Sequence, residues 1–82
     1  MFTVYVLYSA VFGKIYIGFS NDIARRFLFH NELAKKGWTT RYRPWALFYT
    51  EEFDNKNLAM RREKELKTAK GREFIWKMIR GH

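Results

Sequence analysis

Cysteine is absent from this chain of 82 residues, and proline occurs once, at Pro44. Without cysteine the protein holds no disulfide, zinc thiolate or thiol nucleophile. With one proline and no low-complexity tract or internal repeat, the chain also has no Pro-rich linker. These absences predict a single domain, 1–82, which has room for one core and one site but not for a second lobe.

Long apolar runs are missing as well. The N-terminal segment 2–9 is apolar but short and strand-like, whereas a membrane helix needs about 20 apolar residues. We therefore expect a cytoplasmic protein with no membrane partner. Hydrophobic residues make up 48% of the chain and aromatic residues 20%, which excludes a disordered segment and predicts a packed core.

Acidic residues are scarce relative to basic ones. The chain has 8 Asp and Glu against 16 Lys and Arg, a formal net charge of +8. An excess of this size on a small domain predicts a polyanionic partner, with nucleic acid as the first expectation. The alternative is that the charge only keeps the protein soluble or draws it weakly to acidic membranes.

Two short segments, T-V-Y-V-L-Y-S and K-I-Y-I-G-F-S, flank the connection A-V-F-G and predict a β-hairpin. A hairpin centred between residues 10 and 11 places Tyr5 opposite Tyr16 and Tyr8 opposite Gly13. Because side chains alternate along a strand, both phenols and Gly18 share one face, and the other face is aliphatic. This arrangement suits the floor of a site, although tyrosine is also an ordinary strand residue.

A helix is predicted over 22–35, after a cluster of capping residues at 20–22. Its apolar stripe includes Phe27, Leu33 and Ala34, and Arg26 and His30 lie four residues apart at the edge of that stripe. A cation in this position needs an anion or an open cleft. Alternatively, the Arg26 stem covers the core and His30 makes a satisfied buried hydrogen bond.

Cations and aromatic rings alternate in the connection that follows this helix. Such a segment suits nucleic acid, because phosphates take the charge and bases stack on rings. The alternative is that the rings only pack on the domain. The residues concerned are Lys36, Trp38, Arg41, Tyr42 and Arg43.

Residues 45–53 are predicted to form a third strand, which is apolar on both faces at its centre and is therefore expected in the middle of the sheet. A second helix, 56–68, follows a cap at Asp54 or Asn55. Glu63 is its carboxylate that faces the sheet, whereas Glu65 faces solvent. A carboxylate at such an edge is either the partner of an arginine or a ligand for a hard cation such as Mg²⁺.

The C-terminal region is predicted to form a short amphipathic helix after a break at Lys70-Gly71. Its apolar residues at 74, 75, 78 and 79 pack on the domain. The cations around it, among them Lys67 and Lys70, are expected either to bind nucleic acid or to form a solvated charged face.

The ordered set T-V-Y, Y-I-G, Arg26, His30 and the A-M-R-R-E-K-E-L-K segment with Glu63 resembles the GIY-YIG nuclease family over nearly the whole chain. It is most similar to small stand-alone bacterial members that are likened to the nuclease domain of the excinuclease C subunit. Thr3-Val4 replaces the first Gly-Ile of the motif, a position of backbone and packing. Each motif is weak alone, and the set at these spacings is specific.

The resemblance implies an α+β fold, a small three-stranded antiparallel sheet flanked by about three helices. It also implies metal-dependent hydrolysis of phosphodiester bonds, with DNA as the expected substrate and DNA repair as the setting. Tyr16 would be the general base, Arg26 would bind the phosphate, and Tyr5 and His30 would orient water or phosphate. Glu63 would hold one Mg²⁺ or Mn²⁺.

A base role for Tyr16 requires nearby cations that favour phenolate or a coupled proton transfer, because a free tyrosine has a pKa of about 10. Nucleic-acid contacts are expected from Lys36, Arg41, Arg43, Lys67 and Lys70. The rival functions are a non-cleaving nucleic-acid-binding module, a partner-dependent repair accessory and a protein-interaction domain. The sequence shows no recognition domain, so specificity would come from nucleic-acid shape or a partner protein.

Overall fold

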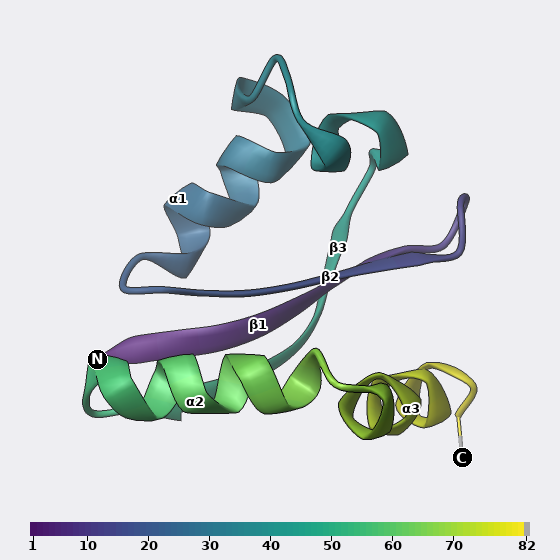
Figure 1. Ribbon diagram of the computed structural model, residues 1–82. Helices are drawn as coiled ribbons and strands as arrows, with labels where there is room; N and C mark the ends of the chain where they lie inside the picture. Colours follow the sequence, from purple (N-terminus) through teal and green to yellow (C-terminus); the bar gives the residue numbers. More distant parts are fainter. Residues whose placement is uncertain (82) are drawn as a thin grey trace.

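The central strand of the sheet is β1 (Phe2–Ser9), with β2 (Lys14–Ser20) on one side and β3 (Ala46–Phe53) on the other, both antiparallel to it. The computed structural model describes residues 1–81. With the helices α1 (Ile23–Leu28), α2 (Lys56–Leu66) and α3 (Ala69–Ile79), this sheet confirms the predicted α+β class. Figure 1 shows helices on both faces of the sheet.

The prediction that the third strand lies in the middle of the sheet is wrong, because β1 takes that place. Val4, Tyr5, Val6 and Leu7 are each at most 1% exposed, so β1 is covered on both faces. In β3, by contrast, Leu47 is 44% exposed. The pairing of β3 with β1 is interrupted between Val6 and Leu7, as is common for bulged edge strands.

The predicted hairpin register is also wrong, by two residues. Tyr5 pairs with Gly18 and Leu7 pairs with Tyr16, because the turn lies one residue further along the chain than predicted. A shift of two residues keeps every side chain on its predicted face. The assignment of Tyr5, Tyr16 and Gly18 to one face is therefore confirmed.

The other face of the sheet carries the aliphatic core. Val4, Val6, Ile15 and Ile17 pack there with Ala59, Leu66 and Ile75 from α2 and α3. Arg62 of α2 donates to both carboxylate oxygens of Glu51 on β3, at 2.8 and 3.0 Å, and so fastens the helix to the edge strand. These two helices form the lower layer in Figure 1.

The predicted helix 22–35 is in fact two elements. After the Asp22 cap, α1 ends at Leu28 and continues as one turn of π-helix, η1 (Phe29–Leu33). A π-turn holds more residues than an α-turn, so it rotates the later side chains. Leu33 is consequently half exposed rather than inward, which corrects the predicted apolar stripe. A 3-10 helix, η2 (Trp38–Tyr42), then leads toward β3.

The break between the last two helices lies at Lys67 and Thr68, not at Lys70-Gly71 as predicted. Thr68 caps α3 by accepting a hydrogen bond from the amide of Gly71, which lies inside the helix. A Cβ on Gly71 would overlap the backbone of Glu65 and Leu66, so this glycine allows the two helices to meet. Within residues 1–81, none of the helices combines the length and apolar character needed to cross a membrane.

Candidate active site

The floor of the candidate site is formed by Tyr5, Tyr16 and Gly18 on the face of the sheet below α1 and η1. The Tyr5 side chain lies across Gly18, where an added Cβ would come within 2.7 Å of its hydroxyl oxygen and 2.8 Å of Cζ. The rings of Tyr5 and Tyr16 are 6.3 Å apart. Gly18 therefore leaves the space that the Tyr5 ring occupies.

His30 covers this floor from the π-turn and is 3% exposed. Its Nε2 lies 3.2 Å from the Tyr5 hydroxyl, and its Nδ1 lies 3.1 Å from the Thr39 hydroxyl. The imidazole ring is 4.6 Å from the ring of Tyr16. Since a hydroxyl group both donates and accepts, each nitrogen of a neutral imidazole has a partner in either tautomer.

The Tyr5 and His30 side chains are both held in their neutral forms. Burial raises the pKa of Tyr5 above its ordinary value of 10.0, and the nearby Arg26 opposes that shift only in part. Burial also lowers the pKa of His30 below 6.5, with help from the charges of Arg26 and Arg43. The stability that neutral His30 contributes is present above pH 6.5 and is lost as the pH falls through its folded-state pKa.

Thr39 is fixed by its own backbone as well as by His30. Its carbonyl accepts a hydrogen bond of 2.8 Å from Nε1 of the buried Trp45, and its side chain is itself buried. The hydrogen-bonded series from Tyr5 through His30 to Thr39 and Trp45 thus connects the sheet, η1 and η2. This series sets the orientation of the imidazole.

We expect Thr39→Val to destabilise the fold by about 1–3 kcal/mol, because it keeps the shape but leaves His30 Nδ1 without its buried partner. Urea unfolding measures this loss. Thr50→Val, at an exposed position of β3, is the matched control and should change stability little. A loss as small in Thr39→Val as in Thr50→Val would contradict the proposed connection.

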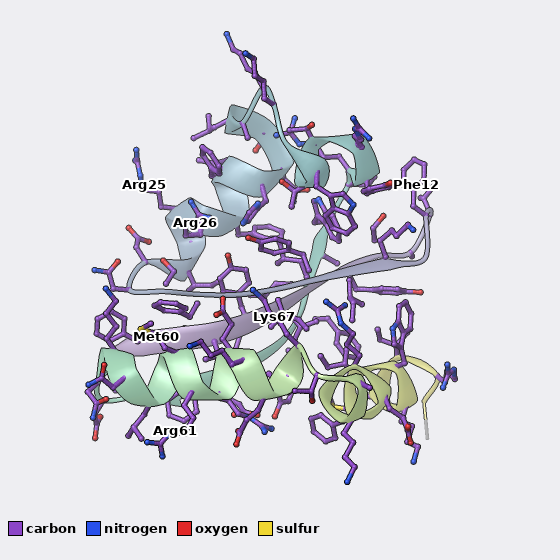
Figure 2. All side chains as sticks on the ribbon, viewed as in Figure 1. Phe12, Arg25, Arg26, Met60, Arg61 and Lys67 are labelled. Atoms are coloured by element: carbon purple, nitrogen blue, oxygen red, sulfur yellow. The ribbon has the colours of Figure 1, made fainter. Side chains whose placement is uncertain are left out.

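Arg26 is a half-buried cation of α1 beside the two phenols. Its guanidinium carbon lies 5.1 Å from the centre of the Phe29 ring, and no carboxylate among residues 1–81 lies within ion-pair distance of it. Figure 2 shows Arg26 over the site face of the sheet and its neighbour Arg25 pointing away into solvent. Arg26 is thus a cation available to an anionic ligand.

Glu63 belongs to α2, which packs on the other face of the sheet. Its side chain is 18% exposed, and Oε2 lies 3.4 Å from Nζ of Lys67. Lys67 lines a groove together with Tyr16, and the charge of Glu63 contributes to the raised pKa of Tyr5. Lys67, the ion-pair partner of Glu63, therefore links this carboxylate to the groove beside Tyr16.

Among the residues that the structure describes, Glu63 is not part of a preformed metal cage. Residues 1–81 contain no cluster of three or more His, Asp or Glu side chains that would form a metal cage. Magnesium is often bound by one or two carboxylates plus substrate phosphate and water. Glu63 fits that open kind of site, with substrate oxygens completing the ligand set.

Arg43 has a structural role that sequence reasoning missed. It donates to the carbonyls of His30 and Ala34, at 2.7 Å each, and to that of Phe29 at 3.4 Å. Asn31 similarly exchanges two hydrogen bonds with the backbone of Trp45, of 2.6 and 2.9 Å. These contacts satisfy the carbonyls around the π-turn and hold His30 over the sheet.

The remaining cations predicted to bind nucleic acid fall into different places. Lys36 and Arg41 line a hollow that shares Trp38 with the groove beside Tyr16, and Lys67 lines that groove itself. Lys70 instead lies at a separate hollow on α3, beside Arg62 and away from the site. The structure thus groups Lys36, Arg41 and Lys67 around the candidate site and leaves Lys70 outside that group.

The sequence model of the GIY-YIG catalytic domain matches residues 1–78, nearly all of the chain. The chain belongs to the GIY-YIG family. Its two signature segments lie side by side on β1 and β2, with Thr3, Val4 and Tyr5 on the central strand and Tyr16, Ile17 and Gly18 on the neighbouring one. The resemblance inferred from the sequence is confirmed at the level of the family.

Relatives of this GIY-YIG protein occur in bacteria and archaea. A UPF0213 protein of Staphylococcus saprophyticus is 41% identical over 56 residues, which cover 68% of each chain. One from Bacillus pumilus is 39% identical over 68% of this chain and 57% of its own, and one from Halobacterium salinarum is 40% identical over 67% and 71%. The match thus spans little more than half of the Bacillus relative. No solved structure matches the chain significantly.

Proposed function

We propose that this GIY-YIG protein is a metal-dependent endonuclease that hydrolyses phosphodiester bonds of nucleic acid, with DNA as the expected substrate. The observation that carries the proposal is Arg26, a half-buried guanidinium without a carboxylate partner among residues 1–81, beside two phenols and an imidazole. Its planar fork matches the non-bridging oxygens of a phosphodiester. A net charge of +8 favours the approach of such a substrate.

In the proposed reaction, Tyr16 acts as the general base toward water. Water attacks phosphorus and gives a proton to the phenolate form of Tyr16. One phosphorus–oxygen bond breaks, and the departing oxygen takes a proton from solvent, which leaves a phosphate monoester and a free hydroxyl group. Tyr16 is assigned this role rather than Tyr5, because Tyr5 is buried with a raised pKa and Tyr16 lines an open groove. The protein forms no covalent intermediate.

Tyr5 and His30 act by holding the site. The Tyr5 hydroxyl is engaged with His30, and the imidazole packs near the ring of Tyr16, so both define where that phenol lies. Both nitrogens of His30 are engaged by the hydroxyls of Tyr5 and Thr39, so the imidazole acts on Tyr16 through packing. Both residues are therefore positioning groups for the base.

Glu63 would hold the Mg²⁺ or Mn²⁺ ion, together with oxygens of the substrate. A hard cation bound there supplies Lewis-acid stabilisation of the charge that develops on phosphate oxygens. The carboxylate is balanced by Lys67, whose own side chain is 47% exposed and can turn away into solvent. Glu63 can thus exchange its lysine partner for a cation.

The rival function is a nucleic-acid-binding module that does not cleave, or a repair accessory that depends on a partner protein. The Glu63–Lys67 ion pair favours this alternative, because it gives the carboxylate a structural use without metal. A cytoplasmic location and a partner that supplies specificity fit either function. The two functions differ in one observable, cleavage that requires a divalent cation.

Incubation of the wild-type protein with labelled DNA and RNA, single-stranded, duplex, flapped and branched, in Mg²⁺ or Mn²⁺ tests the proposal. We expect cleavage of at least one substrate that stops when EDTA removes the cation. Binding without cleavage on every substrate would instead support the binding module.

The exposed cations Lys36 and Arg41 should behave differently from the hydrogen-bonded Arg43 when each is replaced by alanine. Lys36→Ala and Arg41→Ala should weaken binding and lower the salt dependence of affinity by about one phosphate contact each, because both side chains are exposed. Their single-turnover rate at saturation should persist. Salt titrations of affinity, followed by fluorescence anisotropy, measure both quantities.

Arg43→Ala should instead lose stability, by about 2–3 kcal/mol, because carbonyls around the π-turn lose their charged donor. Thermal melts separate this effect from a loss of binding. An Arg43→Ala protein as stable as wild type but weakened in binding would show that Arg43 contacts substrate directly.

A further inference from the structure

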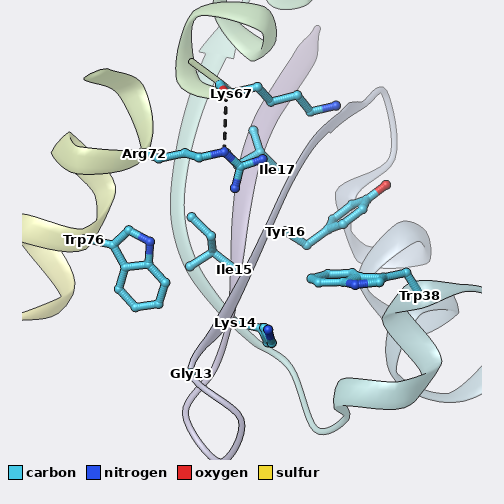
Figure 3. A pocket seen from close by; sticks show the side chains of 9 residues that line it. All are labelled: Gly13, Lys14, Ile15, Tyr16, Ile17, Trp38, Lys67, Arg72 and Trp76. Atoms are coloured by element: carbon cyan, nitrogen blue, oxygen red, sulfur yellow. Dashed lines mark hydrogen bonds between the residues drawn. The ribbon is translucent and has the colours of Figure 1, made fainter. Parts of the chain in front are cut away.

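A groove of about 570 Å³ crosses the free edge of β2 and connects the two faces of the sheet. Figure 3 shows Tyr16 and Trp38 on one side of the strand, and Trp76 and Arg72 on the other. Lys14 and Lys67 lie along its length. The groove therefore begins beside the proposed general base and continues toward α3.

Trp38 offers an unusual amount of apolar surface to this groove. It is 44% exposed, although its ring is supported by Tyr42 at 4.8 Å, Trp45 at 5.8 Å and Tyr16 at 6.5 Å. The planes of Trp38 and Tyr16 are inclined by only 31°. A rigidly supported indole with free surface is suited to stacking on a flat ligand.

The charges of the groove complement a polyanion. Its lining includes Lys14, Lys67 and Arg72, and no acidic residue. Beyond Trp38, the adjoining hollow adds Lys36 and Arg41. Cations on both sides of an exposed indole match a chain that alternates phosphates and flat bases.

We infer that the β2-edge groove binds an unpaired nucleotide, whose base stacks on Trp38 while its flanking phosphates meet Lys67 and Arg72. The inference deepens the proposed function, on which it rests, by naming the substrate class: nucleic acid with an unpaired base at the position of cleavage. Bases inside a duplex are stacked on both faces, so only an unpaired or terminal base can turn its face to the indole. Single-stranded DNA and single-stranded RNA both present such a base.

The test is affinity in EDTA, where no metal-dependent cleavage intervenes. Wild-type protein is titrated with labelled dT15, rU15 and a 15-base-pair duplex, by anisotropy and by quenching of tryptophan emission. We expect both single strands to bind about tenfold more tightly than the duplex and to quench the emission. The ratio of dT15 to rU15 affinity identifies which strand is preferred.

Two pairs of variants localise the effect. Trp38→Leu should weaken single-strand affinity about tenfold with little change for duplex, whereas Phe74→Leu, at a 42% exposed ring outside the groove, should change neither. Arg72→Ala should weaken single-strand binding and lower its salt slope by about one, and Arg80→Ala, an exposed cation outside the groove, should do so less. The arginine pair keeps the test decisive if Trp38→Leu fails to fold.

Equal affinity for single strand and duplex would overturn the inference, as would Arg72→Ala behaving like Arg80→Ala. Neither result would contradict the proposed nuclease activity, because that activity is tested separately by metal-dependent cleavage. Conversely, a protein that prefers single strands but cleaves no substrate would keep the groove as a binding site and would contradict the proposed nuclease activity.

Discussion

Gly18→Ala should lower stability and cleavage together, although it adds only one methyl group. The new Cβ would come within 2.7 Å of the Tyr5 hydroxyl and 3.3 Å of Tyr16 Cε2, in a place where Tyr5 is 1% exposed and cannot swing away. Such overpacking costs about 1–3 kcal/mol. Because the displaced Tyr5 also loses His30, we expect cleavage to fall about 100-fold or more. Chemical unfolding and single-turnover rates measure the two effects.

A double-mutant cycle with Tyr5→Leu separates this explanation from a general weakening of β2. Removing the hydroxyl and Cζ eliminates both closest contacts of the new Cβ, so the double variant should lose less stability than the sum of the single variants. Strict additivity would show that Gly18 matters for another reason, such as the backbone of the strand.

Glu63→Gln should reduce cleavage by about 1,000-fold or more, the largest effect we expect from any isosteric change. Glutamine keeps the shape and hydrogen-bonding capacity of the side chain but removes the charge that would hold the cation. The cation supplies several kcal/mol of transition-state stabilisation, and each 1.4 kcal/mol is about tenfold in rate. Without metal, affinity for nucleic acid should stay equal or rise slightly, because a negative charge has gone.

Glu73→Gln is the matched control for this change. Glu73 pairs with Lys77 as Glu63 pairs with Lys67, each at 3.4 Å and four residues apart on a helix. Both substitutions remove an ion pair of the same length and spacing, although Glu63 is 18% exposed and Glu73 65%, so the control matches the ion pair and not the burial. Thermal melts of both variants should resemble wild type. A large loss of stability in Glu63→Gln alone would identify Glu63 as a structural residue.

The faces of the hairpin could be predicted from the sequence, but its register could not. Alternation along β1 and β2 depends only on the strand period of two, which the apolar pattern reveals directly. The register depends on where the turn closes, and A-V-F-G allows more than one closure. The prediction missed by two residues, so Tyr5 and Tyr16 kept their shared face while their cross-strand partners changed.

The other predictions failed at positions where tertiary contacts determine the local structure. The 22–35 segment has a good helical pattern, but hydrogen bonds from Arg43 and Asn31 favour a π-turn at His30. β3 is apolar on both faces yet lies at an edge, because apolar content does not reveal which strand the others flank. Arg43 is predicted to contact nucleic acid and Thr39 has no predicted role, because nothing local in the sequence marks the partners of either residue.

Much of the candidate site was nevertheless accessible from helical and strand periodicity. The spacing of residues placed Arg26 and His30 on the inner side of one helix and Glu63 on the sheet side of another. In the structure His30 is buried, and Arg26 and Glu63 are partly buried. What periodicity could not supply is the groove that links Lys67 with Tyr16, since that depends on β2 being an edge strand. The catalytic roles of these residues stay predictions.

The most direct test of the central claim is the single-turnover cleavage rate of wild type, Glu63→Gln and Glu73→Gln at saturating protein, in Mn²⁺ and in EDTA. The proposed nuclease requires that wild type and Glu73→Gln cleave at similar rates in Mn²⁺ and not in EDTA, while Glu63→Gln is slower by about three orders of magnitude. A folded Glu63→Gln protein that cleaves as fast as wild type, or wild-type cleavage that persists in EDTA, would contradict it.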